Sequence, residues 1–156
     1  MKKTFLSGLL IILSGFLLMV HAQNPKSSLK NTTLVGFWML EVSLVDTNNG
    51  NKVLHYPGNI MVIDADGHYT IFVYTPRGGL ITNEGEIISE TDSSYVEKVI
   101  HNLNTTLKGK EVQISYKIEN QRLYKSFTIE KNSLGNEINL SETEIWKKIN
   151  KVSDMN

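Results

Sequence analysis

The amino-acid sequence predicts a single all-β domain folded as an eight-stranded antiparallel up-and-down barrel. Three observations support this prediction: eight β-rich runs, several with apolar residues at every second position, turn-forming residues between them, and strand starts that are mostly 9–16 residues apart. Closing the sheet into a barrel removes its exposed edges. A two-sheet sandwich is the alternative, but sandwiches usually need long crossovers, and residues 46–58 form the only long connection between the expected strands.

The eight expected strands follow one another without a convincing helix of three turns between them. They are Trp38–Leu44, Ile60–Asp64, Tyr69–Tyr74, Leu80–Glu90, Tyr95–His101, Glu111–Glu119, Leu123–Glu130 and Ile138–Lys147. The clearest is Glu111–Glu119, in which polar and apolar residues alternate throughout. Turn signals such as Asp64–Gly67 and Asn132–Asn136 separate the runs, because Asp, Asn and Gly accept the backbone angles of tight turns.

Residues 1–22 have the three parts of a secretory signal peptide. Lys2 and Lys3 give a positive start, an apolar run extends from Phe5 to Val20, and a Val-x-Ala sequence ends at Ala22. We expect cleavage after Ala22 and export to the periplasm or the cell exterior, with no membrane association afterwards; an uncleaved N-terminal anchor is the alternative. We further expect residues 23–33 to form a mobile lead-in and residues 34–150 to form the barrel domain.

The composition and the missing motifs exclude several classes of function. The chain of 156 residues has 16 basic and 16 acidic residues and no cysteine. This balance gives no support for nucleic-acid binding, and the lack of cysteine excludes disulfides, thiolate metal sites and a lipoprotein anchor. The sequence has no Gly-x-Ser-x-Gly elbow, no His-x-x-x-His pair and no glycine-rich phosphate loop. We therefore expect no catalytic activity, no metal and no cofactor.

Short motifs occur in a defined order along the expected strands. They are Gly36-Phe37-Trp38, Asp66-Gly67, Gly85, Ser93-x-Tyr95-x-Glu97, Gly109, Tyr116 and Glu144-Ile145-Trp146-Lys147. Together they resemble small exported bacterial lipocalin-like domains of the calycin group, whose function is unassigned. The resemblance covers residues 34–148 and implies a lipocalin-like barrel whose closed end is plugged by Trp38. The Thr-Asp-Tyr turn and the late arginine of lipocalins are absent, so Lys147 or Lys148 is expected to stack on Trp38 instead.

One strand carries the most informative polar residues. In an extended chain, Tyr95, Glu97, Val99 and His101 share one face. If this face points inward, the Glu97 carboxylate needs a cationic partner, which Arg122 or Lys125 could provide. Glu97 would then be either a polar anchor for a ligand or part of an internal hydrogen bond that stabilises a filled barrel. Acid–base catalysis by Glu97 and His101 is a third, less favoured interpretation.

These observations predict an exported protein that binds a small, largely apolar or planar ligand in the barrel interior. The alternative is a filled barrel that acts through its outer surface as an envelope interaction or inhibitor module. Alternation places Leu44 on the inward face together with part of the expected ligand-binding set. The complete set is Trp38, Leu40, Val42, Tyr69, Ile71, Tyr95, Glu97, His101, Tyr116 and Phe127. Ligand identity, oligomeric state and whether the interior is hollow stay open at this stage.

Overall fold

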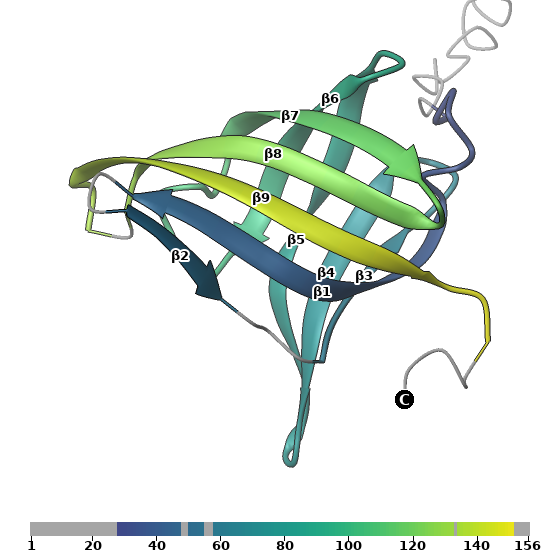
Figure 1. Cartoon of the computed structure of the whole chain (residues 1–156), viewed down its shortest axis with the longest axis horizontal. Coiled ribbons are helices and arrows are strands. Elements are labelled where there is room, and N and C mark those ends of the chain that lie inside the picture. The colour runs from purple at the N-terminus through teal and green to yellow at the C-terminus, as the bar shows by residue number, and fades with distance from the viewer. Residues whose placement is uncertain (1–27, 48–49, 55–57, 133, 152–156) are drawn as a thin grey trace, which may run out of the picture.

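The computed structural model describes residues 28–47, 50–54, 58–132 and 134–151, and within these ranges the chain forms antiparallel strands and no helix (Figure 1). The expected signal peptide, residues 1–22, lies outside the described residues. The strands are β1 (Gly36–Thr47), β2 (Gly50–Leu54), β3 (Asn59–Ile63), β4 (His68–Thr75), β5 (Gly78–Glu90), β6 (Ser94–Asn102), β7 (Glu111–Glu119), β8 (Arg122–Lys131) and β9 (Glu137–Ile149).

Eight of these strands close into a barrel. Neighbouring strands from β3 to β9 pair in chain order, β3 pairs with β1, and β9 returns to pair with β1 along almost its whole length. This last ladder extends from Phe37↔Ile149 to Asp46↔Ser141. The predicted eight-stranded antiparallel barrel is therefore confirmed. The eight expected strands correspond to β1 and β3–β9.

Strand β2 was not expected, because it lies in the segment predicted to be a long connection. The first part of β1 pairs with β3, from Gly36↔Ile63 to Met39↔Ile60. The second part pairs instead with β2, from Ser43↔Leu54 to Thr47↔Gly50. The long strand β1 therefore has two successive partners on the same side, and β2 lies beside it at one end of the barrel (Figure 1).

The closed end of the barrel is built around Trp38, as the resemblance implied. The indole is fully buried, and its Nε1 donates a hydrogen bond to the Leu34 carbonyl at 2.8 Å. Lys148 Nζ lies 4.5 Å from the centroid of the Trp38 ring, which confirms the expected lysine stacking. A Cβ at Gly36 would lie 3.1 Å from Lys148 Cε, and Gly36 has a φ of +134°. Glycine therefore lets the chain pass beneath the barrel at this point.

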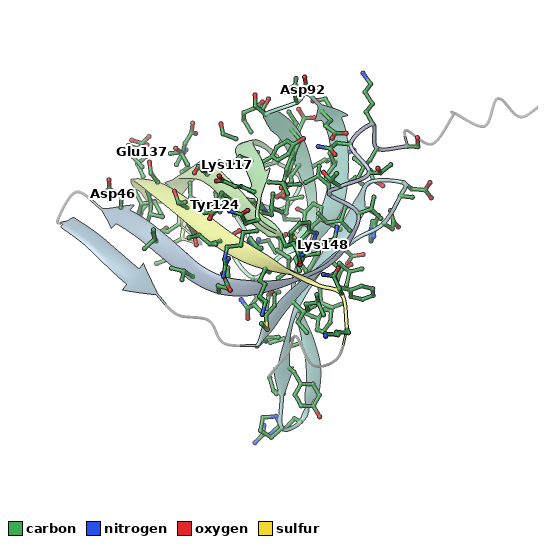
Figure 2. The ribbon with its side chains drawn as sticks, turned by 45° about the vertical axis from the view of Figure 1, so that its right-hand side comes forward. Asp46, Asp92, Lys117, Tyr124, Glu137 and Lys148 are labelled. Atoms are coloured by element: carbon green, nitrogen blue, oxygen red, sulfur yellow. The ribbon has the colours of Figure 1, made fainter. Side chains whose placement is uncertain are left out.

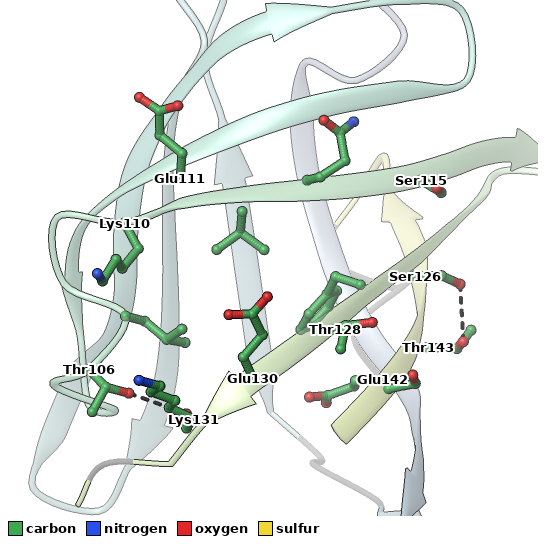
Figure 3. Close-up of a pocket in the computed structure, with 15 residues that line it drawn as sticks. Thr106, Lys110, Glu111, Ser115, Ser126, Thr128, Glu130, Lys131, Glu142 and Thr143 are labelled. Carbon is green, nitrogen blue, oxygen red and sulfur yellow. Dashed lines mark hydrogen bonds between the residues drawn. The ribbon is translucent and has the colours of Figure 1, made fainter. Parts of the chain in front are cut away.

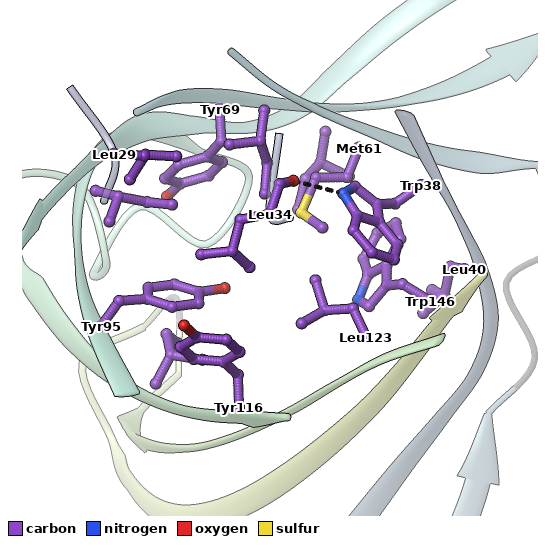
Figure 4. Packing of buried hydrophobic residues seen from close by; sticks show 14 residues of the cluster. Leu29, Leu34, Trp38, Leu40, Met61, Tyr69, Tyr95, Tyr116, Leu123 and Trp146 are labelled. Atoms are coloured by element: carbon purple, nitrogen blue, oxygen red, sulfur yellow. Dashed lines mark hydrogen bonds between the residues drawn. The ribbon is translucent and has the colours of Figure 1, made fainter. Parts of the chain in front are cut away.

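The core fills the half of the barrel next to this closed end (Figure 4). Leu34 lies between the two tyrosines Tyr95 and Tyr116 on one side and the two tryptophans on the other (Figure 4). The buried cluster comprises Leu29, Leu34, Trp38, Leu40, Met61, Ile63, Tyr69, Ile71, Ile87, Tyr95, Ile114, Tyr116, Leu123 and Trp146. A core of this kind, rather than any disulfide, must stabilise the cysteine-free domain.

The described part of the expected lead-in takes part in this closure. The backbone N–H groups of Lys30 and Asn31 donate to the Glu90 carboxylate, at 3.0 and 3.1 Å. The Asn31 side chain donates to the Tyr116 hydroxyl at 2.9 Å, and Leu29 is 92% buried, being only 8% exposed. Residues 28–33 thus pack against the barrel, so the expectation of a mobile lead-in is wrong for them. The apolar contacts of Leu29 come from strands distant in sequence, and its polar neighbours do not reveal them.

The opposite end, called the mouth below, is formed by the β1–β2, β4–β5, β6–β7 and β8–β9 connections. Figure 2 shows Asp46 and Glu137 toward the mouth, whereas Asp92 and Lys148 lie toward the closed end. The β4–β5 hairpin projects beyond the other strands (Figure 1). The described residues include no helix with the length and apolar character needed to cross a membrane.

Candidate functional site

The half of the barrel next to the mouth contains a cavity of about 320 Å³. This volume lies within the range of ligand pockets, and the lining combines apolar walls with a few polar groups, as such pockets usually do. The apolar lining residues are Ile71, Val99, Leu103, Leu107, Val112, Ile114, Phe127, Ile129 and Trp146. The polar ones are Asn59, Thr82, Asn83, Glu97, Asn102, Asn104, Lys125, Glu142 and Glu144.

Three charged side chains, called the ion cluster below, meet at the base of this cavity. Lys125 of β8 is 2% exposed, and its Nζ donates to Glu97 Oε1 of β6 at 3.0 Å. The same Nζ lies 3.6 Å from Glu144 Oε2 of β9. Of the two partners considered for Glu97, the structure selects Lys125, whereas Arg122 pairs with Glu41.

Strand alternation explains why these charges point inward. On β8, Leu123 and Lys125 are buried and Phe127 packs against the core, so every second residue faces the interior. On β9, Glu142, Glu144 and Trp146 follow the same period. Each is opposite an inward residue of β8, in the pairs Phe127↔Glu142, Lys125↔Glu144 and Leu123↔Trp146.

The environment of the ion cluster shifts the pKa values of its members. Burial alone would lower the pKa of Lys125, but the negative charge of Glu97, with smaller contributions from Tyr95 and Glu144, outweighs it and raises that pKa well above its usual value. Lys125 is therefore charged at neutral pH. Burial raises the pKa of Glu144, and the neighbouring Lys125 offsets this only in part. Glu144 Oε2 also accepts a hydrogen bond from Trp146 Nε1 at 2.9 Å.

Two buried tyrosines lie next to the ion cluster. The Tyr69 hydroxyl donates to Asn83 Oδ1 at 3.4 Å, and burial raises the pKa of Tyr69. Tyr95 is 1% exposed and its ring lies 5.2 Å from that of Tyr116. Its hydroxyl is the one buried side-chain polar atom of the described residues without a hydrogen-bond partner. Such an atom is uncommon in a folded protein and needs an explanation.

A third carboxylate, that of Glu142, lies where the cavity meets the outer wall. Glu142 lines the cavity and accepts a hydrogen bond from the buried Ser43 hydroxyl of β1.

Strands β7 and β8 pair only from Ser115↔Ser126 to Glu119↔Arg122. Toward the mouth the two strands separate, and a groove of about 770 Å³ lies between them (Figure 3).

The groove and the cavity share four side chains, those of Leu107, Val112, Phe127 and Glu142. At this place the cavity is therefore bounded by side chains and not by a continuous hydrogen-bonded ladder. Rotation of a side chain takes picoseconds to nanoseconds at exposed positions, whereas opening a paired ladder requires local unfolding. Between the mouth ends of β7 and β8, side-chain rotation alone can therefore open the wall of the cavity.

The structure divides the ten residues that the sequence predicted for ligand binding. Ile71, Glu97 and Phe127 line the cavity. Five others lie in the packed core: Trp38, Leu40, Tyr69, Tyr95 and Tyr116. Tyr116 lies at the closed end, where its hydroxyl meets Asn31 and the Thr91 carbonyl. Alternation thus correctly placed these eight residues inside the barrel. It could not show which of them belong to the packed core and which line the cavity.

The predicted inward orientation of Val42 and Leu44 is wrong. The β1–β9 register shifts between Leu40 and Val42, so that Glu41 is an extra residue in β1. A bulge of this kind moves the following side chains to the opposite face. Ser43 is consequently buried, whereas Leu44 is 39% exposed and Val42 lies in neither the core nor the cavity lining.

The predicted common face of Tyr95, Glu97, Val99 and His101 holds for the first three residues only. The β5–β6 register changes between Gly85↔Val99 and Glu84↔His101, which leaves Ile100 as an extra residue. His101 is exposed as a result, and Asn102 lines the cavity in its place. His101 therefore cannot act together with Glu97 in the interior, which removes the geometric basis of the acid–base interpretation.

Sequence reasoning missed Glu142 and Glu144 as interior residues. A signal was present, because Glu142 and Glu144 precede the buried Trp146 by four and two positions in a strand of period two.

The residues that surround the cavity offer hydrogen-bond acceptors, one ammonium and two aromatic rings. In the described part of the chain, no group of three His, Cys, Asp or Glu side chains is placed to hold a metal ion.

Comparison with known proteins gives a family but no activity. No curated protein matches the chain with significant similarity. Residues 33–155, which include all nine strands, match the model of a family described as a domain of unknown function, DUF4488. The chain belongs to this DUF4488 family.

Proposed function

We propose that this protein is an exported, non-catalytic binding protein that holds a small, largely apolar molecule in the mouth half of its barrel. The observation that carries the proposal is the cavity of about 320 Å³ with apolar walls and the ion cluster at its base. A barrel evolved only for stability would be expected to fill this space, because interiors pack like organic crystals. A buried ion cluster also contributes little net stability compared with well-packed apolar residues.

The walls of the cavity supply the binding energy in this proposal. Phe127, Ile129 and Val99 would contact the apolar body of the ligand. A ligand that buries about 200 Å² of apolar surface gains about 5 kcal/mol at 25 cal/mol per Å². Part of this gain is lost to the ordering of the ligand, so micromolar or weaker affinity is expected unless polar contacts add to it.

The neutral fluorescent dye N-phenylnaphthylamine tests interior binding. The dye should bind saturably to the mature chain and gain fluorescence in an apolar environment. Val99→Phe places a larger side chain in the cavity, since Val99 is 2% exposed and lines it, and should abolish the signal. Ile100→Phe is the matched control, because Ile100 is the adjacent residue and is 42% exposed on the outer face. Equal binding by both variants would place the dye outside the barrel and refute the proposal.

A second candidate function uses the outer surface. The β4–β5 hairpin carries exposed apolar side chains, namely Tyr74 at 76%, Leu80 at 49% and Ile81 at 45% exposure. A projecting apolar hairpin is typical of a protein-interaction site. A photoreactive benzoylphenylalanine at position 74 would crosslink an envelope protein in cells if this function is correct. Absence of crosslinks there, together with dye binding in the cavity, would favour the interior function.

A further inference from the structure

The charge balance of the cavity indicates what kind of ligand it takes. Among the described lining residues, three carboxylates, those of Glu97, Glu142 and Glu144, stand against the single ammonium of Lys125. Lys125 is already engaged, at 3.0 Å from Glu97 and 3.6 Å from Glu144. The protein therefore provides one cation for three anionic groups; the other donors to Glu142 and Glu144 are neutral, namely Ser43 Oγ and Trp146 Nε1.

We propose that the ligand is an organic amine, with its ammonium group bound between Glu142 and Glu144 and its apolar body against Phe127 and Val99. This proposal rests on the function proposed above and names the class of molecule that the same cavity takes. An anionic ligand would have to approach three carboxylates to reach one lysine that is already paired, and like charges at close range oppose binding.

Three further observations agree with a cationic head group. The Tyr95 hydroxyl, in the packed core next to the ion cluster, has no hydrogen-bond partner among the described residues, and its oxygen can accept a hydrogen bond from a donor. The cavity lining also includes the rings of Phe127 and Trp146, and aromatic faces attract ammonium groups. Burial raises the pKa of Glu144, as expected for a carboxylate that lacks a full counter-charge in the ligand-free protein.

The groove between β7 and β8 extends the same charge pattern to the surface. Glu111 and Glu130 line it on the outside, and Glu142 lines both the groove and the cavity (Figure 3). Lys110 and Lys131 also border the groove, so its net charge is only slightly negative. Carboxylates nevertheless continue from the outer wall, through Glu142, to the ion cluster.

Three probes with one apolar body test the proposal: phenylbutylamine, phenylbutanol and phenylbutyrate. In isothermal titration of the mature wild-type chain at pH 7, affinity should decrease in the order amine, alcohol, acid. The amine should bind at least about tenfold more tightly than the acid, which is the effect of about one charge-assisted hydrogen bond. This comparison needs no variant. Glu142→Gln/Glu144→Gln should then weaken amine binding about tenfold or more and leave alcohol binding unchanged. Glu119→Gln, in an exposed ion pair, is the control and should change none of the three.

The outcomes separate this proposal from the proposed function. If phenylbutyrate binds as tightly as the amine or more tightly, Lys125 determines the ligand class and the amine proposal is wrong, while interior binding stands. If the Gln variant, folded by circular dichroism, keeps the preference for the amine, the ammonium does not lie between the two glutamates and the proposal is also wrong. If none of the three probes binds, both the amine proposal and the interior function are refuted.

Discussion

Replacement of Lys125 by methionine tests whether the ion cluster is a buried charge network. Methionine has nearly the length and volume of lysine, so the change removes the ammonium without creating a large cavity. The Glu97 carboxylate, 5% exposed, loses its partner at 3.0 Å, and Glu144 loses a cation at 3.6 Å. In the described part of the chain, neither carboxylate forms an ion pair with another cation.

The expected loss of stability follows from this burial. Lys125 is 2% exposed, so solvent screening does not reduce the effect as it does for surface pairs. Removing one partner of a buried pair costs about 3–5 kcal/mol. Domains of this size are stable by about 5–15 kcal/mol, so the variant should be much weakened and in the worst case unfolded.

Urea unfolding followed by tryptophan fluorescence measures this loss. Lys117→Met is the matched control, because Lys117 forms an ion pair with Glu119 at the similar distance of 3.3 Å but with both side chains well exposed. It should change stability by about 0–1 kcal/mol. If Lys125→Met lowers the free energy of unfolding by less than about 1 kcal/mol, the ion cluster is hydrated and is not a buried charge network. Lys125→Met/Glu97→Gln should recover part of the loss, which keeps the test valid if the single variant does not fold.

Three further predictions concern packing, pH and processing. Gly85→Ala should destabilise the domain by about 1–3 kcal/mol in urea unfolding, because a Cβ there would lie 2.3 Å from the Lys98 carbonyl oxygen and 2.7 Å from the Tyr69 hydroxyl; wild-type stability would contradict this. Burial raises the pKa of Glu144 in the folded protein above its usual 4.5. The resulting contribution of Glu144 to the free energy of unfolding is full below pH 4.5 and is lost as the pH rises through the raised pKa. The stability of Glu144→Gln relative to wild type should therefore increase from pH 4.5 upward, whereas parallel pH profiles would show that Glu144 is not desolvated. N-terminal sequencing of the exported protein should begin at Gln23, and a retained Met1 would favour the uncleaved anchor.

The strands and the barrel closure were predictable because their signals are local. The alternation in Glu111–Glu119 and the Asp-Gly turn at residue 67 depend on near neighbours in sequence, and the structure places β7 and the β3–β4 hairpin accordingly. Trp38 and Lys148 were also anticipated at the closed end, through the resemblance. Export, ligand binding and the absence of catalysis stay predictions.

The wrong orientations of Val42, Leu44 and His101 arise where one extra residue in a strand moves the following side chains to the opposite face. The extra residues Glu41 and Ile100 are invisible to a pattern of period two, because each bulge depends on the register with a neighbouring strand far away in sequence. Leu29 was missed for a similar reason, since its apolar pocket is formed by the barrel and not by adjacent residues. The division between a packed closed end and a hollow mouth half depends on side-chain volumes around the whole circumference, which no single segment reveals.

The most direct test of interior binding is a crystal structure of the protein with phenylbutylamine. Density for one molecule is expected in the cavity of about 320 Å³, with its phenyl ring against Phe127 and Val99. Its nitrogen should lie about 3 Å from a carboxylate oxygen of Glu142 or Glu144. A cavity filled only by ordered water, or a ligand bound solely on the outer wall, would refute interior binding.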